Sequence, residues 1–278
     1  MSIPGVDFEF IAREVKERSG LVLTPEKAYL LETRLAPIAR REGIATVAEL
    51  LRVVRTRREE RVIAQIVDAL STNETFFFRD KTPFDAVRDT VIPALFTAKG
   101  RGARLRVWCA ACSTGQEPYS LAMTFEEMRA AGQPVEAEII ATDLSERVLE
   151  KARSGLYGQF EVQRGLPIQM LVKHFTKQGE AWKISDRIRS QVDFRKVNLL
   201  EPFGSLGQFD LVFCRNVLIY FDAEAKKRVL ERIAAQMHDH SFLVLGGSES
   251  TMGITDAFQS APNRRSLHTR TAGWRKAA

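Results

Sequence analysis

Cysteine is scarce in this chain, with three residues among 278, at positions 109, 112 and 214. An odd and sparse set argues against a disulfide framework and fits a reducing compartment. Cys109 and Cys112 have the spacing of a redox pair, but we favour the simpler interpretation that small residues pack there at the end of a strand. A zinc site is less favoured still, because no second Cys-x-x-Cys and no paired histidines complete four ligands.

Long hydrophobic runs are also missing. The sequence contains no stretch of about 18 uninterrupted apolar residues, so we expect no direct membrane insertion. The first residues lack the basic segment and apolar run of a secretory signal, and we expect a cytoplasmic protein. Fixed-period repeats are absent, which excludes a solenoid. With 45% hydrophobic and 27% charged residues, the chain is expected to be globular.

Charge is unevenly distributed, although the net charge is only +6. Residues 34–61 contain eight arginines and four glutamates, whereas residues 1–33 contain four basic and six acidic residues. An ordinary solvated helical face explains such a pattern. The alternative is a docking surface for an acidic partner, either nucleic acid or an acidic protein helix.

The first part of the chain has a helical pattern. Apolar positions predict one helix that ends near Gly20 and another over residues 59–70. Between them, Thr24 is predicted to cap a helix that Gly43 would stop. Pro37 interrupts this helix, and we expect a kink or a break near residue 36.

From residue 105 onward, strand patterns alternate with helix patterns, which predicts a mainly parallel sheet. An insertion over residues 158–189 breaks the rhythm. There we expect two short strands, 171–175 and 181–184, in a small antiparallel flap. The strands predicted for the main sheet are 105–109, 137–142, 192–198, 209–214, 242–245 and 266–270.

The most informative segment is residues 109–120, CAACSTGQEPYS, between a predicted strand and a predicted helix. Gly115 supplies the backbone freedom of a tight turn, and Pro118 suits the first helical position. Glu117 places a carboxylate among the free N–H groups of the helix start, where it can hold a cationic amine. In a doubly wound sheet, nucleotide-like ligands bind at this place. One glycine is a weak signal, since many such turns need it for geometry alone.

Polar residues follow two further predicted strands. Asp143 is a candidate for binding ribose hydroxyls, with an acid at the start of a helix as its alternative role. Arg215, Asn216 and Tyr220 are pocket candidates after the strand over residues 209–214. Asn216 could equally cap a turn, and Tyr220 could be a partly buried aromatic.

Together with an aromatic segment at residues 72–79, these segments resemble the chemotaxis receptor methyltransferase family, CheR. The resemblance covers the whole chain and rests on five motifs in family order. They are TNETFFFR at 72–79, STGQEPYS at 113–120, ATD at 141–143, NL at 198–199 and CRNVLIYF at 214–221. Gln116 and Gly247 depart from residues that are frequent in the family.

The resemblance implies an α/β protein with a Rossmann-like, S-adenosylmethionine-dependent methyltransferase sheet. A helical receptor-docking domain would span residues 1–72, and a methyltransferase domain residues 73–278. A small antiparallel β-subdomain would be inserted at about residues 158–190. The implied reaction transfers a methyl group from S-adenosylmethionine to glutamate side chains of bacterial chemoreceptors, giving methyl esters and S-adenosylhomocysteine.

The resemblance also implies roles for individual residues. Arg79 and Tyr220 would act at the methyl-transfer site. Glu117 would hold the amino group of the cofactor and Asp143 its ribose. The full set of implied cofactor-binding residues is Asn73, Thr75, Arg79, Glu117, Asp143, Asn198, Leu199, Arg215 and Asn216. No metal is implied.

In this family a basic helix faces the acidic methylation helices of the receptor, so Arg34, Arg40 and Arg41 become docking candidates. In some relatives the β-subdomain captures a C-terminal receptor peptide by strand addition, and the sequence does not decide whether this chain does so. A glutamate carboxylate, with a pKa of about 4.3, is ionised at neutral pH and needs no general base.

Two other classes of function stay open. A nucleic-acid methyltransferase would fit the basic charge, but the chain lacks an N-P-P-Y type motif and a Pro-Cys nucleophile loop. A non-catalytic binding module would use the cofactor as a regulatory ligand while the arginine-rich helices bind a signalling partner. Retained cofactor binding without methyl transfer would identify that second class.

Overall fold

A computed structural model describes residues 3–262 and 264–275, with no account of the side chain at position 27. The chain forms two compact units. The first consists of Met1–Thr72 with Tyr220–Ala225, and the second of Asn73–Ile219 with Lys226–Ala278. In the described part of the chain, no helix combines the length and the apolar character needed to cross a membrane.

The first unit is all-helical. After the first helix, α1 (Gly5–Ser19), the chain makes a short 3₁₀ turn over Pro25–Lys27, where the sequence predicted the start of a longer helix. The α1 helix ends at Gly20, whose φ of 76° is the left-handed C-cap that the sequence predicted. The helices of the first unit are α1 (Gly5–Ser19), α2 (Tyr29–Arg41), α3 (Val47–Arg57) and α4 (Glu60–Leu70).

The predicted break near residue 36 is wrong, because α2 runs continuously through Pro37. Proline removes one hydrogen bond from a helix interior. In α2 the buried side chains of Leu31, Leu35 and Ile38 lie at helical spacing on both sides of it. Packing of that apolar stripe thus outweighs the local cost of the proline.

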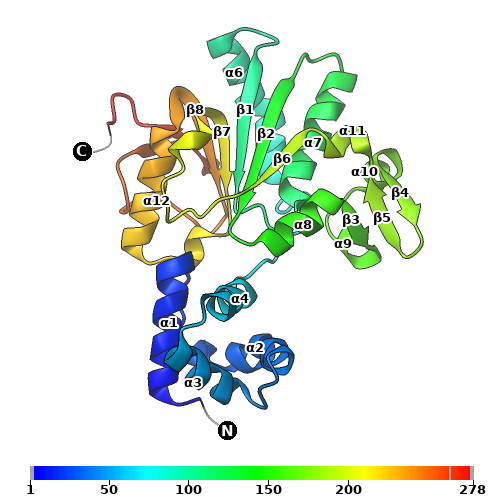
Figure 1. The fold of residues 1–278 in the computed structure, drawn as a ribbon. Helices are drawn as coiled ribbons and strands as arrows, with labels where there is room; N and C mark the ends of the chain where they lie inside the picture. The colour runs from blue at the N-terminus through cyan, green and yellow to red at the C-terminus, as the bar shows by residue number, and fades with distance from the viewer. Residues whose placement is uncertain (1–2, 263, 276–278) are drawn as a thin grey trace. The chain divides into compact units, whose positions relative to one another are not determined.

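The second unit is built on a seven-stranded sheet, which Figure 1 shows with β1, β2, β6 and β7 side by side. Five neighbouring strands are parallel, and the last two are antiparallel additions, as a mainly parallel sheet requires. In spatial order the strands are β6 (Val192–Lys196), β2 (Glu136–Asp143), β1 (Arg104–Ala110), β7 (Phe209–Cys214), β8 (Met237–Leu245), β10 (Arg264–Arg270) and β9 (Phe258–Ala261).

The strand order reverses between β1 and β7. From β1 the chain proceeds to β2 and β6 on one side, and from β7 to β8 on the other. A ligand crevice forms outside the carboxyl ends of the strands at such a switch point. The topology therefore predicts that the loops that follow β1 and β7 form the binding site.

Helices connect the strands of the main sheet (Figure 1). Before β1 the chain forms α5, a π turn over Val87–Val91, and α6. Of the remaining helices, α7 follows β1, α8 follows β2, and α12 lies between β7 and β8 in the chain. The bounds are α5 (Thr82–Ala86), α6 (Ile92–Lys99), α7 (Gln116–Ala130), α8 (Glu146–Ser154) and α12 (Ala223–Ala235).

A small antiparallel sheet is inserted between α8 and β6, as predicted. Its strands have the order β3-β5-β4, and the predicted strand at 181–184 is β5. The predicted strand at 171–175 is wrong, because Leu171 and His174 are buried three residues apart on a helix. The elements are β3 (Leu156–Gly158), α9 (Gln159–Gln163), α10 (Ile168–His174), β4 (Phe175–Gln178), β5 (Ala181–Ile184) and α11 (Asp186–Arg189).

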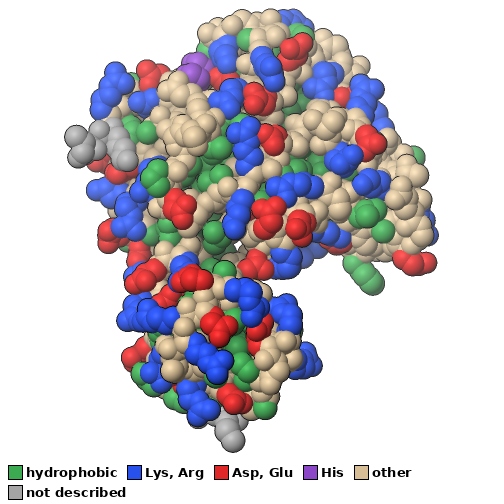
Figure 2. All heavy atoms as spheres, viewed as in Figure 1, with side chains coloured by type: hydrophobic (Ala, Val, Ile, Leu, Met, Phe, Trp, Pro, Cys, Tyr) green, Lys and Arg blue, Asp and Glu red, His purple; other side chains and the backbone are tan. Residues whose placement is uncertain are grey.

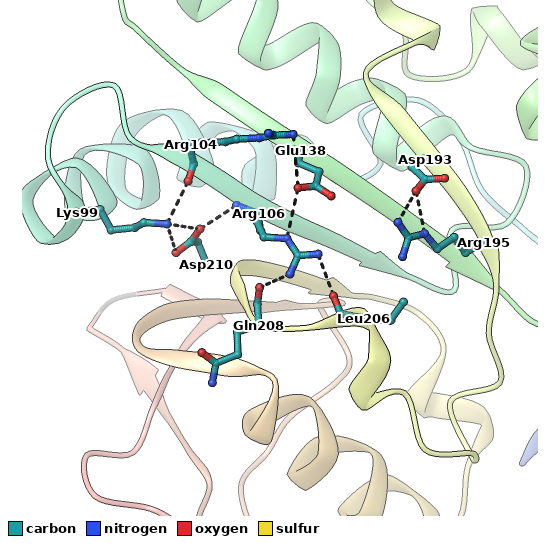
Figure 3. A network of polar contacts seen from close by, with 9 residues as sticks. All are labelled: Lys99, Arg104, Arg106, Glu138, Asp193, Arg195, Leu206, Gln208 and Asp210. Atoms are coloured by element: carbon teal, nitrogen blue, oxygen red, sulfur yellow. Dashed lines mark hydrogen bonds and ion pairs between the residues drawn. The ribbon is translucent and has the colours of Figure 1, made fainter.

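The amino ends of the central strands are joined by a polar network around the buried carboxylate of Asp210 (Figure 3). Asp210 on β7 accepts hydrogen bonds from Lys99 Nζ at 2.8 and 2.9 Å and from the backbone N–H of Arg106 at 2.8 Å. Burial alone would raise the pKa of Asp210, but these hydrogen bonds, with one from His240, lower it. The network links α6, β1 and β7 at the end of the sheet opposite the carboxyl ends of the parallel strands.

Candidate functional site

The turn between β1 and α7 has an unusual backbone. Ala111, Ser113 and Gly115 have φ values of 58°, 51° and 92°, all in the left-handed region. A Cβ atom on Gly115 would lie 2.9 Å from Cβ of Ala152 on α8. Gly115 is therefore required by conformation and by packing, which confirms its predicted place in the turn. Pro118 occupies the third position of α7 and not the first, because the helix begins at Gln116.

Glu117 and Arg215 form an ion pair at the switch point of the sheet. Arg215 Nη1 donates to Glu117 Oε2 at 2.9 Å, and Nη2 donates to Asp80 Oδ2 at 2.7 Å and to the carbonyl oxygen of Arg79 at 3.1 Å. The Arg215 side chain is only 1% exposed. One buried guanidinium thus joins the start of α7, the loop after β7 and the segment around residue 80.

The electrostatics of Glu117 favour a further cation. Burial raises the pKa of the Glu117 carboxyl above its ordinary value, and the nearby Arg215 only partly opposes this effect. A second positive group beside the carboxylate would stabilise its ionised form. The start of α7 is therefore suited to a ligand with an ammonium group.

Asp143 connects the carboxyl end of β2 with the turn after β1. Its Oδ2 accepts from the backbone N–H of Ser113 at 2.8 Å, and its Oδ1 accepts from that of Ser145 at 3.0 Å. The second contact is the role at the start of a helix that the sequence offered as an alternative. Its proposed contact with ribose stays a prediction.

The segment that carries Asn73, Thr75 and Arg79 contacts the turn between β1 and α7. Ser113 Oγ donates to the carbonyl oxygen of Asn73 at 2.8 Å. Arg79 Nη1 donates to the carbonyl oxygen of Glu74 at 2.8 Å. Thr75 and Arg79 are half-buried. The structure thus brings this segment together with Glu117 and Arg215 in one part of the second unit.

Asn198 and Leu199 follow β6, next to the carboxyl end of β2. The backbone N–H of Val197 donates to the carbonyl oxygen of Asp143 at 2.9 Å, which fixes this proximity. Asn198 Oδ1 accepts from the N–H of Leu200 at 3.0 Å, and Leu199 is buried. Both residues therefore belong to the neighbourhood of Asp143.

Tyr220 belongs to the first unit, where its carbonyl oxygen accepts from the N–H of Val22 at 3.0 Å. Its side chain is half-buried, and its role in methyl transfer stays a prediction.

The three docking candidates on α2 differ in environment. Arg34 is half-buried and donates to the carbonyl oxygens of Leu70 and Ser71 at 2.7 and 3.2 Å. Arg40 and Arg41 are exposed, and Arg41 donates to Gln65 Oε1 at 2.6 Å. Figure 2 shows basic and acidic side chains interspersed over the visible face. Of the three arginines, Arg34 has an evident structural function.

Cys109, Cys112 and Cys214 are all buried and free. Burial raises the pKa of each thiol well above its ordinary value. Thiols of this kind are unreactive. This environment agrees with the packing interpretation favoured from the sequence.

Two acidic residues of the site were missed by sequence reasoning. Asp80 pairs with Arg215. Its position directly after the motif residue Arg79 could have indicated that it belongs to the site. Glu249 accepts hydrogen bonds from the backbone of the loop after β7. It lies in the segment GGSES at residues 246–250, of which only Gly247 was considered from the sequence.

Comparison with known proteins identifies both parts of the chain. A family model described as "CheR methyltransferase, SAM binding domain" matches residues 73–267, and "CheR methyltransferase, all-alpha domain" matches residues 6–71. Chemotaxis protein methyltransferase 1 of Pseudomonas aeruginosa is 42% identical over 263 residues, covering 93% of this chain and 95% of that protein. Chemotaxis protein methyltransferase Cher2 of Pseudomonas putida is 41% identical with the same coverage. Chemotaxis protein methyltransferase 1 of Vibrio cholerae is 37% identical, covering 93% of this chain and 94% of that protein.

Proposed function

Because this chain belongs to the CheR methyltransferase family and is an S-adenosylmethionine-dependent methyltransferase, we propose that it methylates glutamate side chains of bacterial chemoreceptors. The products are glutamate methyl esters and S-adenosylhomocysteine, and the reaction supports chemotactic adaptation. The curated relatives are named chemotaxis protein methyltransferases, which supports a substrate in the chemotaxis system.

The observation that carries the proposal is the Glu117 carboxylate at the start of α7, whose side chain is 13% exposed and paired with the buried Arg215 at the switch point. Its raised pKa fits a site completed by the ammonium group of S-adenosylmethionine. When bound, the cofactor supplies an electrophilic methyl group on its sulfonium.

Individual residues are assigned to parts of the cofactor. Glu117 would hold the amino group and Asp143 the ribose. Asn198 and Leu199 would bind on the adenine side. Asn73, Thr75, Arg79, Arg215 and Asn216 complete the binding site.

The chain contributes positioning to the reaction and needs no general base. The substrate glutamate is ionised at neutral pH, so its oxygen is already nucleophilic. The Arg79 guanidinium is suited to orient a carboxylate, since charge-assisted hydrogen bonds from arginine are strong and directional. Tyr220 is also assigned to methyl transfer, as the family motif implies. Holding the two reactants in place supplies most of the rate enhancement.

The proposed partners are the acidic methylation helices of the receptors. Residues 1–72 would serve as the docking domain, with Arg40 and Arg41 as exposed contacts and Arg34 in a supporting role. Residues 73–278 would form the methyltransferase domain, with the β-subdomain at about residues 158–190. The enzyme would work in the cytoplasm, associated with receptor arrays through the receptors themselves. A receptor C-terminal peptide at the edge of the β-subdomain is a further proposed contact.

The test is transfer of labelled methyl from S-adenosylmethionine to cytoplasmic fragments of chemoreceptors, followed by mild alkaline treatment. Base-labile label on the receptor would establish carboxyl methyl esters. Arg79→Ala should abolish the transfer while the protein still folds. Cofactor binding without transfer to any receptor fragment would refute the proposal and favour the binding-module alternative.

A further inference from the structure

Glu249 holds two loops together with a single carboxylate. Its Oε1 accepts hydrogen bonds from three consecutive backbone N–H groups of residues 217–219, at 3.0, 2.8 and 3.3 Å. Its Oε2 accepts from the N–H groups of Asn216 and Gly246, both at 2.8 Å. The residue is only 8% exposed. Five backbone donors therefore converge on one acidic group beside the carboxyl ends of β7 and β8.

The loop after β7 depends on this acceptor. Buried backbone N–H groups without a partner are costly, and residues 216–219 direct four of them at Glu249. Asn216 also has a φ of 58°, in the left-handed region that asparagine tolerates but does not prefer. The conformation of the loop is thus imposed by the carboxylate and not by local preference alone.

Gly246, which directly follows β8, packs closely against both Glu249 and Asn216. A Cβ atom there would lie 2.7 Å from Glu249 Oε2 and 2.9 Å from Asn216 Nδ2. The backbone of the loop after β8 therefore packs directly against Asn216. Asn216 is therefore held at its backbone N–H by the carboxylate, while its side-chain amide lies against Gly246.

We propose that Glu249 is a positioning residue for the cofactor site. It acts through Asn216 and through Arg215, the preceding residue, whose guanidinium pairs with Glu117. Its carboxylate sets the loop after β7 in the binding conformation before the cofactor arrives. The inference rests on the proposed function only in that it assigns Arg215 and Asn216 to the cofactor site.

The experiment measures binding of S-adenosylmethionine by calorimetry to the Glu249→Ala variant, with and without added acetate. Affinity should fall by about tenfold or more, because the loop loses a charged acceptor. Acetate should restore part of it, since converging backbone N–H groups form an anion-binding nest. Sodium chloride at the same ionic strength should restore less, because chloride lacks the two oxygens of a carboxylate.

Two further variants make the test specific. Glu249→Gln keeps one acceptor oxygen but presents an amide nitrogen to the other donors, so affinity should fall and acetate should not restore it. Asp256→Ala removes an exposed acid from the same loop and should leave affinity unchanged. In steady state, Glu249→Gln should raise KM for S-adenosylmethionine and leave KM for the receptor fragment unaltered.

Wild-type cofactor affinity in Glu249→Gln would overturn the proposal. So would a folded Glu249→Ala variant whose lost affinity acetate does not restore. If Glu249→Ala does not fold, Glu249→Gln decides alone. Because the readout is cofactor binding, a failure to methylate chemoreceptors would refute the proposed function without touching this inference.

Discussion

The guanidinium of Arg34 donates to the carbonyl oxygen of Leu70 at 2.7 Å and so caps the last turn of α4. A cation at this place satisfies a carbonyl that the helix leaves without a partner, and it interacts favourably with the helix dipole. Arg34 therefore stabilises the first unit, whereas Arg40 and Arg41 on the same helix are exposed.

Substitutions on α2 should separate folding from docking. Arg34→Ala should lower the free energy of unfolding by about 1–3 kcal/mol. The double substitution Arg40→Glu and Arg41→Glu should leave stability nearly unchanged but weaken binding to receptor fragments, most strongly at low salt. Urea denaturation and binding titrations at two salt concentrations measure both effects. Normal receptor affinity in the double variant would show that Arg40 and Arg41 are ordinary solvated surface residues with no role in docking.

Removing the charge of Glu117 should impair cofactor binding. Glu117→Gln keeps the shape of the side chain but loses the attraction for an ammonium group, so affinity for S-adenosylmethionine should fall by roughly tenfold or more. Asp80→Asn is the matched control, because Asp80 binds the same guanidinium of Arg215 and its side chain is 52% exposed. The control should change affinity only a few-fold. Equal losses in the two variants would contradict a direct role for Glu117.

Gly115 should tolerate no side chain. Gly115→Ala forces a Cβ to within 2.9 Å of Ala152 at a positive φ, and the free energy of unfolding should fall by roughly 2–4 kcal/mol. Gly132→Ala imposes a similar φ of 82° with no atom within 4 Å, so it measures the conformational cost alone. The difference between the two variants gives the packing cost against α8. A difference near zero would show that α8 moves away freely.

Stability should depend on pH through His268. Burial lowers the pKa of this histidine below its ordinary value of 6.5. The unfolded chain then binds more protons than the folded one between the two pKa values, so stability falls as the pH decreases below about 6.5. His268→Leu should flatten this dependence between about pH 7 and about pH 5.5, as measured by urea unfolding. An unchanged slope would show that other groups cause the effect.

Strand patterns that alternate with helix patterns were enough to predict most strands of the main sheet and, in the small antiparallel sheet, the strand β5. Short segments were harder, because Leu171 and His174 fit either a strand or one helical turn. Tertiary packing decided between them, as it did at Pro37, where buried leucines keep α2 intact. The additional edge strand β9 was not predicted.

Residues of the candidate site could be predicted where a charged side chain lies at, or shortly after, the end of a predicted strand. Glu117, Asp143 and Arg215 were each found in this way. Glu249 was missed because four of its five partners are backbone N–H groups about 30 residues away, and contacts to the backbone leave no pattern of residue types. Asp80 was missed for a related reason, since its partner Arg215 is distant in the chain.

The burial of all three cysteines has a practical consequence. Alkylating reagents react with thiolates that solvent can reach, and Cys109, Cys112 and Cys214 offer neither accessibility nor a low pKa. A cysteine introduced at an exposed position, such as Val172 on α10, would be the only readily labelled thiol of the folded protein. A fluorophore attached there would report on the inserted sheet without prior removal of the native cysteines.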